Sequence, residues 1–128
     1  MKNVGKNKIE RVAILGASDN PERYSYKAFK MLEEYGHERV PVSPKLAQLE
    51  SVPVVKELKD IAGRIDTLTM YVGPGISSGL ESAILELKPK RVIFNPGSEN
   101  PILQKNLHDA GIKVLEACTL VLLRTQQF

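Results

Sequence analysis

Strand-like and helix-like segments alternate along this chain. Arg11–Leu15 is a short apolar run, and further strand-like runs cover about 38–43, 66–72, 91–95 and 112–116. Continuous apolar runs are typical of strands that are covered on both faces of a sheet. Because helix-like segments separate these strands, right-handed crossovers and a parallel sheet are expected.

Apolar residues at helical spacing fill the intervals between the strands. The predicted helices cover about 24–35, 55–62 and 101–110, and a fourth begins after Ser78, which has capping-box spacing to Glu81. The C-terminal TLVLLRTQQF segment fits either a last helix on the sheet or part of a dimer contact. We therefore predict an α/β fold, a Rossmann-like doubly wound parallel five-stranded sheet in the order 3-2-1-4-5, with helices on both faces.

Length, charge and composition narrow the possible classes of protein. With 128 residues the chain fits one domain, predicted over 1–128, with 1–8 as a flexible basic N-terminus. A net charge of +3 and 5% aromatic residues are poor material for a basic stripe or for base stacking, so no nucleic-acid partner is expected. No segment approaches the ~20 apolar residues of a membrane span. The one cysteine, Cys118, excludes an internal disulfide and favours a cytoplasmic location.

Three turns rich in glycine and proline follow strands of the predicted sheet. GASDNP follows the first strand, GPG (Gly73–Gly75) the third and NPGSENP (Asn95–Pro101) the fourth. Strand-to-helix turns of a parallel sheet share its carboxyl edge, and ligands bind there at the point where the winding reverses. In the order 3-2-1-4-5 this point lies between the first and fourth strands. The residues predicted to contribute from these turns are Gly16, Gly73, Asn95, Pro96 and Gly97.

The first turn is an altered dinucleotide fingerprint. The usual pattern is G-x-G-x-x-G, but here Ser18 replaces the second glycine and Pro21 the third. Gly16 permits the sharp turn, and the small Ser18 still lets backbone amides approach a phosphate. Arg23 lies at the start of the predicted helix, where an anion is favoured and a guanidinium forks onto a pyrophosphate. The next three residues are candidates to flank the same ligand: Tyr24, Ser25 and Tyr26.

The end of the second strand argues against NAD. Dinucleotide folds usually carry an acidic residue there that holds the ribose hydroxyls. This chain has Ser43, Pro44 and Lys45 instead. A lysine suits an additional phosphate beside the ribose, which NADP carries on the 2′ oxygen and coenzyme A on the 3′ oxygen.

The segments GASDNPERYSYKAFKMLEEYG, VPVSPK, NPG and EACTLVLL resemble the small single-domain CoA-binding proteins, stand-alone relatives of the CoA-binding domain of succinyl-CoA synthetase. The resemblance covers the chain from about Lys8 onward and implies a Rossmann-like fold that binds coenzyme A. By position it implies a pyrophosphate and pantetheine side formed by Gly16, Ala17, Ser18, Arg23 and Tyr26. It also implies that the adenosine 3′-phosphate meets Ser43, Pro44 and Lys45.

Catalytic residues are hard to find. His37 is expected at the amino edge of the sheet and His108 on a solvent-facing side of a helix, both away from the ligand. Cys118 follows the fifth strand on the ligand edge, either as a small buried thiol or as a partner for a mixed disulfide with coenzyme A. We expect a protein that binds coenzyme A or acyl-CoA without catalytic activity of its own, as a homodimer or beside a partner enzyme subunit. The alternatives are an NADP-type enzyme subunit or redox sensor, and a subunit that has lost its ligand.

Overall fold

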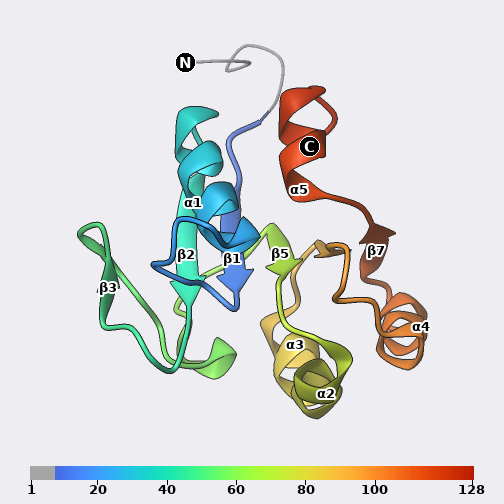
Figure 1. Cartoon of the computed structure of the whole chain (residues 1–128). Coiled ribbons are helices and arrows are strands. Elements are labelled where there is room, and N and C mark those ends of the chain that lie inside the picture. Colours follow the sequence, from blue (N-terminus) through green and yellow to red (C-terminus); the bar gives the residue numbers. More distant parts are fainter. Residues whose placement is uncertain (1–7) are drawn as a thin grey trace.

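A parallel sheet of five strands forms the centre of the computed structural model, which describes residues 8–128 (Figure 1). Its strands, in spatial order, are β2 (Glu38–Val42), β1 (Arg11–Leu15), β5 (Thr67–Met70), β6 (Arg91–Phe94) and β7 (Lys113–Glu116). The predicted Rossmann-like α/β class is confirmed. Apart from Lys8, the predicted flexible N-terminus lies outside the described residues.

The order of the strands differs from the predicted 3-2-1-4-5 in one respect. Counted along the chain, the order is second, first, third, fourth and fifth, so β5 rather than β6 borders β1, with Val12 opposite Thr67. The outer edge of β2 is already occupied, because Val55 donates its N–H to Pro41 O at 3.0 Å and accepts from Ser43 N at 2.9 Å. The chain therefore returns across the sheet and adds β5 on the other side of β1.

The connection between β2 and β5 contains no α-helix. The helix predicted over 55–62 is replaced by a short hairpin, β3 (Gln48–Leu49) and β4 (Val52–Pro53), and one 3-10 turn, η1 (Leu58–Asp60). Leu58 is the buried residue of that turn, and Gly63, with a φ of +87°, redirects the chain soon afterwards. Val55, Leu58 and Ile61, whose spacing suggested one face of a helix, thus pack on the core from an irregular segment.

Helices cover both faces of the sheet. One face carries α1 (Tyr24–Glu34) and α5 (Thr119–Arg124), and the other carries η1, α3 (Glu81–Leu87) and α4 (Pro101–Asp109). The C-terminal segment therefore forms a last helix, α5, which contributes Leu123 to the core. The short elements α2 (Pro74–Ser77) and η2 (Ser78–Leu80) precede α3. The expected capping box is wrong, because Leu80 is the N-cap of α3 and makes no side-chain cap.

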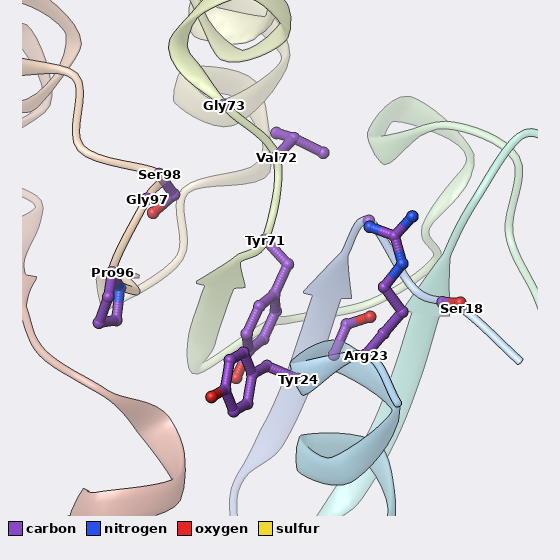
Figure 2. Close-up of a pocket in the computed structure, with 11 residues that line it drawn as sticks. Ser18, Arg23, Tyr24, Tyr71, Val72, Gly73, Pro96, Gly97 and Ser98 are labelled. Carbon is purple, nitrogen blue, oxygen red and sulfur yellow. The ribbon is translucent and has the colours of Figure 1, made fainter. Parts of the chain in front are cut away.

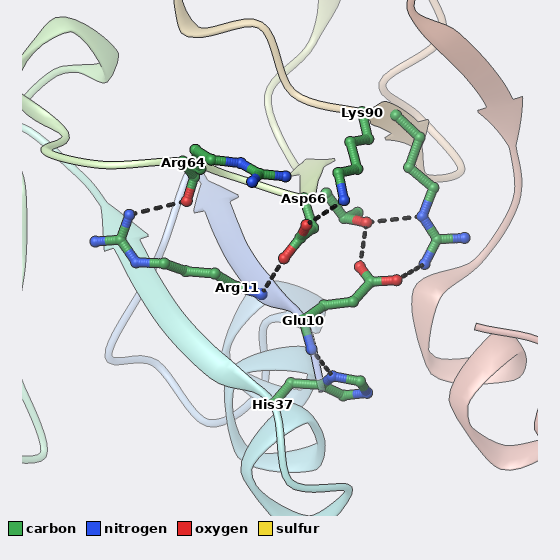
Figure 3. Close-up of polar contacts among 8 residues, drawn as sticks. Glu10, Arg11, His37, Arg64, Asp66 and Lys90 are labelled. Carbon is green, nitrogen blue, oxygen red and sulfur yellow. Dashed lines mark hydrogen bonds and ion pairs between the residues drawn. The ribbon is translucent and has the colours of Figure 1, made fainter. Parts of the chain in front are cut away.

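The amino edge of the sheet holds a network of paired charges (Figure 3). Thr67 Oγ1 donates to Glu10 at 2.5 Å and accepts from Arg91 Nε at 2.7 Å, and the Arg91 guanidinium lies 3.3 Å from the second Glu10 oxygen. His37 lies at the same edge, as predicted, and its Nδ1 accepts the Glu10 N–H at 3.0 Å. Helices of the described segment 8–128 are all too short or too polar to cross a membrane.

Candidate functional site

The winding of the sheet reverses between β1 and β5. After β1 the chain passes to α1 on one face, and after β5 it passes to α2 and α3 on the other face. The two connections diverge at the carboxyl edge and leave a crevice, which is where sheets of this order bind their ligands. The reversal was predicted between the first and fourth strands along the chain. It lies instead between the first and third, β1 and β5. The turn after β6 still borders the crevice, because β6 is next to β5.

Gly16 determines how closely the two sides of the crevice approach. Its φ is +91°, and a Cβ atom there would lie 3.0 Å from both Tyr71 O and Val72 Cγ1. The amides of Gly16 and Ala17 both donate to Val42 O, at 3.2 and 3.1 Å. A side chain at this position is therefore excluded by the backbone conformation and by space together.

A central cavity of about 230 Å³ opens at the crevice (Figure 2). No carboxylate lines it, and its one charged group is Arg23, which forms no ion pair with any described residue. Ser18 Oγ accepts the N–H of Asn20 at 3.0 Å and so shapes the loop before α1. An anion is the ligand that this cavity favours. The residues that line it are Gly16, Ser18, Arg23, Tyr24, Ser25, Tyr71, Val72, Gly73, Pro96, Gly97 and Ser98.

An apolar cleft of about 410 Å³ adjoins the central cavity on the β2 side, and the two share Gly16 and Val72. Lys56 and Lys59 contribute cationic groups to its lining, and Glu57, whose carboxylate lies 3.8 Å from Lys59 Nζ, contributes one anionic group. A flat apolar group with a negative charge near one end would match this lining. The residues that line the cleft are Leu15, Gly16, Val42, Pro44, Lys56, Glu57, Leu58, Lys59, Val72, Ile76, Leu80 and Ala83.

A third cavity, of about 430 Å³, adjoins the central one on the β7 side, and we call it the thiol cavity because Cys118 lines it. It shares Tyr24, Tyr71 and Pro96 with the central cavity, and Figure 2 shows the two tyrosines next to each other. Its lining is Tyr24, Tyr71, Asn95, Pro96, Cys118, Leu120 and Arg124. The apolar cleft, the central cavity and the thiol cavity thus form a row along the carboxyl edge.

Most of the predicted site residues line this row. The central cavity brings together Gly16, Ser18, Arg23, Gly73, Pro96 and Gly97, the apolar cleft adds Pro44, and the thiol cavity adds Asn95 and Cys118. Cys118 is half-buried. This burial fits neither a fully buried packing thiol nor a fully exposed reactive one, so both roles that the sequence allowed stay open. Tyr24 and Ser25 line the central cavity as well, so two of the three candidates at the start of α1 are placed there.

Four predicted residues line none of these three cavities. Ala17 packs in the core under α1, and Ser43 is buried, with its hydroxyl accepting the N–H of Lys45 at 3.2 Å. The Lys45 side chain is exposed. The Tyr26 hydroxyl donates to Glu50, which also binds Lys30 Nζ at 2.6 Å, so Tyr26 anchors the β3–β4 hairpin to α1.

Sequence reasoning missed several lining residues. Tyr71 and Val72 directly follow β5, and their place between a strand and a glycine turn was the available signal. Burial raises the pKa of Tyr71 to about 12, so its hydroxyl stays protonated at neutral pH. Lys56 and Lys59 could not be identified, because the helix expected there would have directed them differently.

Comparison with known proteins identifies the class to which this Rossmann-like domain belongs. A family model described as a CoA binding domain matches residues 10–124. The chain belongs to this family of CoA-binding domains, and the resemblance inferred from the sequence is confirmed.

The chain is also similar to individual proteins over all or part of its length. The uncharacterized protein YneT of Bacillus subtilis (strain 168) is 33% identical over 106 residues, which cover 83% of this chain and 78% of YneT. The alpha subunit of the ADP-forming acetate–CoA ligase II of Pyrococcus furiosus is 34% identical over 62 residues, which cover 48% of this chain and 14% of the subunit. The crystal structure of an uncharacterized protein, 40% identical, has a TM-score of 0.89 and covers 95% of this chain and 100% of that one.

Proposed function

We propose that this protein binds coenzyme A, free or as acyl-CoA, along the row of three cavities. The observation that supports this proposal best is the chemical order of the row within a CoA-binding domain. An apolar cleft with two lysines and Glu57, a central cavity with Arg23 as its one charged group, and a cavity with Cys118 and Arg124 follow one another. Coenzyme A has the same order: a base with a 3′-phosphate, a pyrophosphate, and a pantetheine arm that ends in a thiol.

The pyrophosphate is assigned to the central cavity. Arg23 is the N-cap of α1, an 11-residue helix, and no side chain caps the amides of the first turn. These amides and the helix dipole favour an anion, and the guanidinium adds a charge-assisted contact. Gly16 lines the same cavity without a side chain of its own, so a phosphate can approach its backbone.

The adenosine is assigned to the apolar cleft, with Pro44 and Ile76 against the base. Its 3′-phosphate then lies near a group of lysines. Lys45 is the predicted reader of this phosphate, and Lys56 and Lys59 in the cleft lining are further cations for it. None of the three carries a buried ion pair that would compete with a ligand, since the one pair in the group, Lys59 with Glu57 at 3.8 Å, is exposed.

The pantetheine arm is assigned to the thiol cavity, past Tyr24 and Tyr71. Its thiol then approaches Cys118, which keeps the predicted mixed disulfide open. In that reaction the Cys118 thiolate attacks oxidised coenzyme A, one mixed disulfide forms, and one coenzyme A thiolate leaves. Mass spectrometry should show one added CoA that dithiothreitol removes and that Cys118→Ala never acquires.

A binding module without its own chemistry is the role that we propose. One relative is the alpha subunit of a ligase, of which this chain matches 14%. A partner enzyme subunit, or a second copy of this chain, is therefore a reasonable companion. The function of the pair would be to present CoA or acyl-CoA to a catalytic group that the partner supplies.

Native mass spectrometry followed by calorimetry tests the proposal. Freshly purified protein should carry an adduct of CoA mass, and calorimetric titration should rank CoA above dephospho-CoA and both above NAD. NADP is the competing ligand, because it also carries an additional phosphate. Binding of NADP with CoA excluded would overturn the proposal in favour of an NADP-type protein.

A further inference from the structure

Asn95 lines the thiol cavity, but its polar side-chain atoms form hydrogen bonds within the protein. It follows β6 and is 2% exposed. Its Nδ2 donates to Thr69 Oγ1 at 2.7 Å and to Met70 O at 2.9 Å, and its Oδ1 accepts the N–H of Thr119 at 2.8 Å. Both amide hydrogens are used. The sequence position of Asn95 suggested a side chain that contacts the ligand. Its amide hydrogens are instead already bonded to Thr69 and Met70.

The network around Asn95 joins three parts of the carboxyl edge. Thr69 in β5 and Thr119 at the start of α5 are fully buried, and their hydroxyls lie 2.8 Å apart in a hydrogen bond. The Asn95 carbonyl accepts from Ser98 N at 2.9 Å and from Ser98 Oγ at 2.7 Å, which fixes the turn at the central cavity. One residue thus ties the ends of β5 and β6 to the start of α5.

The residues next to these anchor points form the walls of the thiol cavity. Cys118 and Leu120 flank Thr119, and Tyr71 follows Met70. The Tyr71 hydroxyl is buried and has no hydrogen-bond partner among the described residues. Tyr71 is therefore held by packing and by the backbone that Asn95 fixes at Met70, and its hydroxyl lies near the Thr69 and Thr119 side chains, which oppose the rise of its pKa. A shift of the network would move both walls of the cavity.

We infer that Asn95 is a positioning residue for the ligand site, which sets the width of the thiol cavity and the place of Cys118 through Thr69, Met70 and Thr119. The inference rests on the proposed function in so far as the pantetheine arm occupies this cavity. It assigns Asn95 to one half of the ligand only. Asn95 lines neither the apolar cleft nor the central cavity, and of the walls that it positions only Tyr71 is shared with the central cavity.

Asn100 provides a matched control. It is also buried, at 5% exposure, and its Nδ2 donates to Ser77 Oγ at 2.9 Å and Ser78 Oγ at 3.1 Å, while its Oδ1 accepts from Leu103 N at 3.2 Å. It lines none of the three cavities. Asn100→Asp therefore introduces the same buried carboxylate on the other face of the sheet, at the N-cap of α4, where serine hydroxyls can turn to donate to it.

The experiment compares Asn95→Asp with Asn100→Asp in the full chain. In Asn95→Asp a carboxylate oxygen replaces the amide nitrogen 2.9 Å from Met70 O, and two acceptors then face each other. Two quantities are measured: the ratio of affinities for CoA and for adenosine 3′,5′-bisphosphate, and the rate at which a disulfide reagent modifies Cys118 without ligand. We expect the affinity ratio to fall about tenfold and the Cys118 rate to change severalfold in Asn95→Asp only.

An unchanged affinity ratio and Cys118 rate in folded Asn95→Asp would overturn the inference, as would equal changes in Asn100→Asp. If Asn95→Asp does not fold, Thr119→Val replaces it. This variant removes the hydroxyl contact with Thr69 but keeps the N–H bond from residue 119 to Asn95. We expect a smaller fall of the affinity ratio and a smaller change of the Cys118 rate. If wild-type protein binds neither CoA nor the bisphosphate, the proposed function fails. The Cys118 rate then still decides whether Asn95 positions the cavity wall.

Discussion

The two edges of the sheet use charge in opposite ways. At the amino edge, Arg91 is 13% exposed, pairs with Glu10, and lies over the Phe128 ring at 4.4 Å. At the carboxyl edge, Arg23 is exposed and forms no ion pair with a described residue. A charge that the fold has already neutralised contributes to stability, whereas an unpaired charge at the mouth of a cavity is available to a ligand.

The contrast extends to the backbone. The carboxyl edge is formed by turns in which main-chain atoms approach one another closely, as Gly16 does with Tyr71. The amino edge is instead closed by side chains that reach across strands, as Thr67 does between Glu10 and Arg91. Substitutions of exposed side chains at the carboxyl edge should therefore mainly affect binding, and those of the paired side chains at the amino edge should mainly affect folding. Substitutions of the turn glycines at the carboxyl edge should affect both, because their backbone conformation is strained for other residues.

The largest effect is expected at Gly16. Gly16→Ala places a Cβ 3.0 Å from Tyr71 O at a positive φ, so the walls of the crevice must move. We expect CoA affinity to fall by at least ~100-fold and the free energy of unfolding by about 2–3 kcal/mol. Calorimetry and urea unfolding measure the two quantities.

Gly97→Ala is the control for Gly16. Its φ is +94°, but a Cβ there has no atom within 4 Å, so strain acts without crowding. A cost of about 1–2 kcal/mol is expected. Equal losses of affinity in the two variants would show that the close approach at Gly16 has no special role.

A pair of arginine substitutions tests the contrast between the edges directly. Arg23→Gln should weaken CoA about 10- to 100-fold and change stability by less than ~0.5 kcal/mol, because it removes a phosphate contact from the surface. Arg91→Gln should leave CoA affinity unchanged and cost about 2 kcal/mol, since Glu10 loses its charged partner. If Arg91→Gln weakens CoA binding as much as Arg23→Gln does, the amino edge also determines the affinity for CoA, and the contrast between the two edges is wrong.

A smaller effect is expected at the 3′-phosphate. A charge-assisted contact contributes about 1.5–3 kcal/mol, and the exposed Lys45 should give the low end, so CoA should bind about tenfold tighter than dephospho-CoA. Lys45→Ala should largely close this gap at low salt, where screening is weak. Should Lys56→Ala close the gap and Lys45→Ala leave it open, the phosphate lies inside the apolar cleft instead.

The regular part of the fold was accessible from the sequence. β1 covers the predicted residues, and β6 and β7 each differ from prediction by one residue, because continuous apolar runs mark buried strands directly. The return of the chain after β2 was not accessible. It depends on the pairing of Val55 with Pro41 and Ser43, and the apolar spacing around Val55 favoured a helix instead.

The sequence predicted the sheet edge at which the candidate site lies better than it predicted the directions of the side chains there. All strand-to-helix turns of a parallel sheet lie at one edge whatever the strand order, so Gly16, Gly73 and Gly97 came together although the order was wrong. Side-chain direction was harder to predict. Tyr24 and Tyr26 are two residues apart on α1 and therefore face different sides of the helix, one toward the cavities and the other toward Glu50.

The smallest effect is expected from His37, and it should leave the carboxyl edge untouched. His37 is 9% exposed, its Nδ1 accepts the Glu10 N–H, and its ring packs on Phe128 at 5.0 Å. Burial lowers its pKa below the ordinary value of 6.5, and nearby Arg91 acts in the same direction, while the Glu10 carboxylate opposes them.

The unfolded state therefore binds the proton more readily than the folded state does, so the free energy of unfolding should fall as pH drops through 6.5 toward the lower native pKa. Urea unfolding between pH 5.5 and 7.5 measures this slope, which His37→Gln should reduce. His108→Gln is the control for replacing a histidine, because that side chain is 78% exposed. The affinity for CoA in wild type and His37→Gln should change equally with pH, since the imidazole lies at the opposite edge from the proposed ligand. A pH dependence of binding that disappears in His37→Gln would mean that the amino edge is coupled to the site.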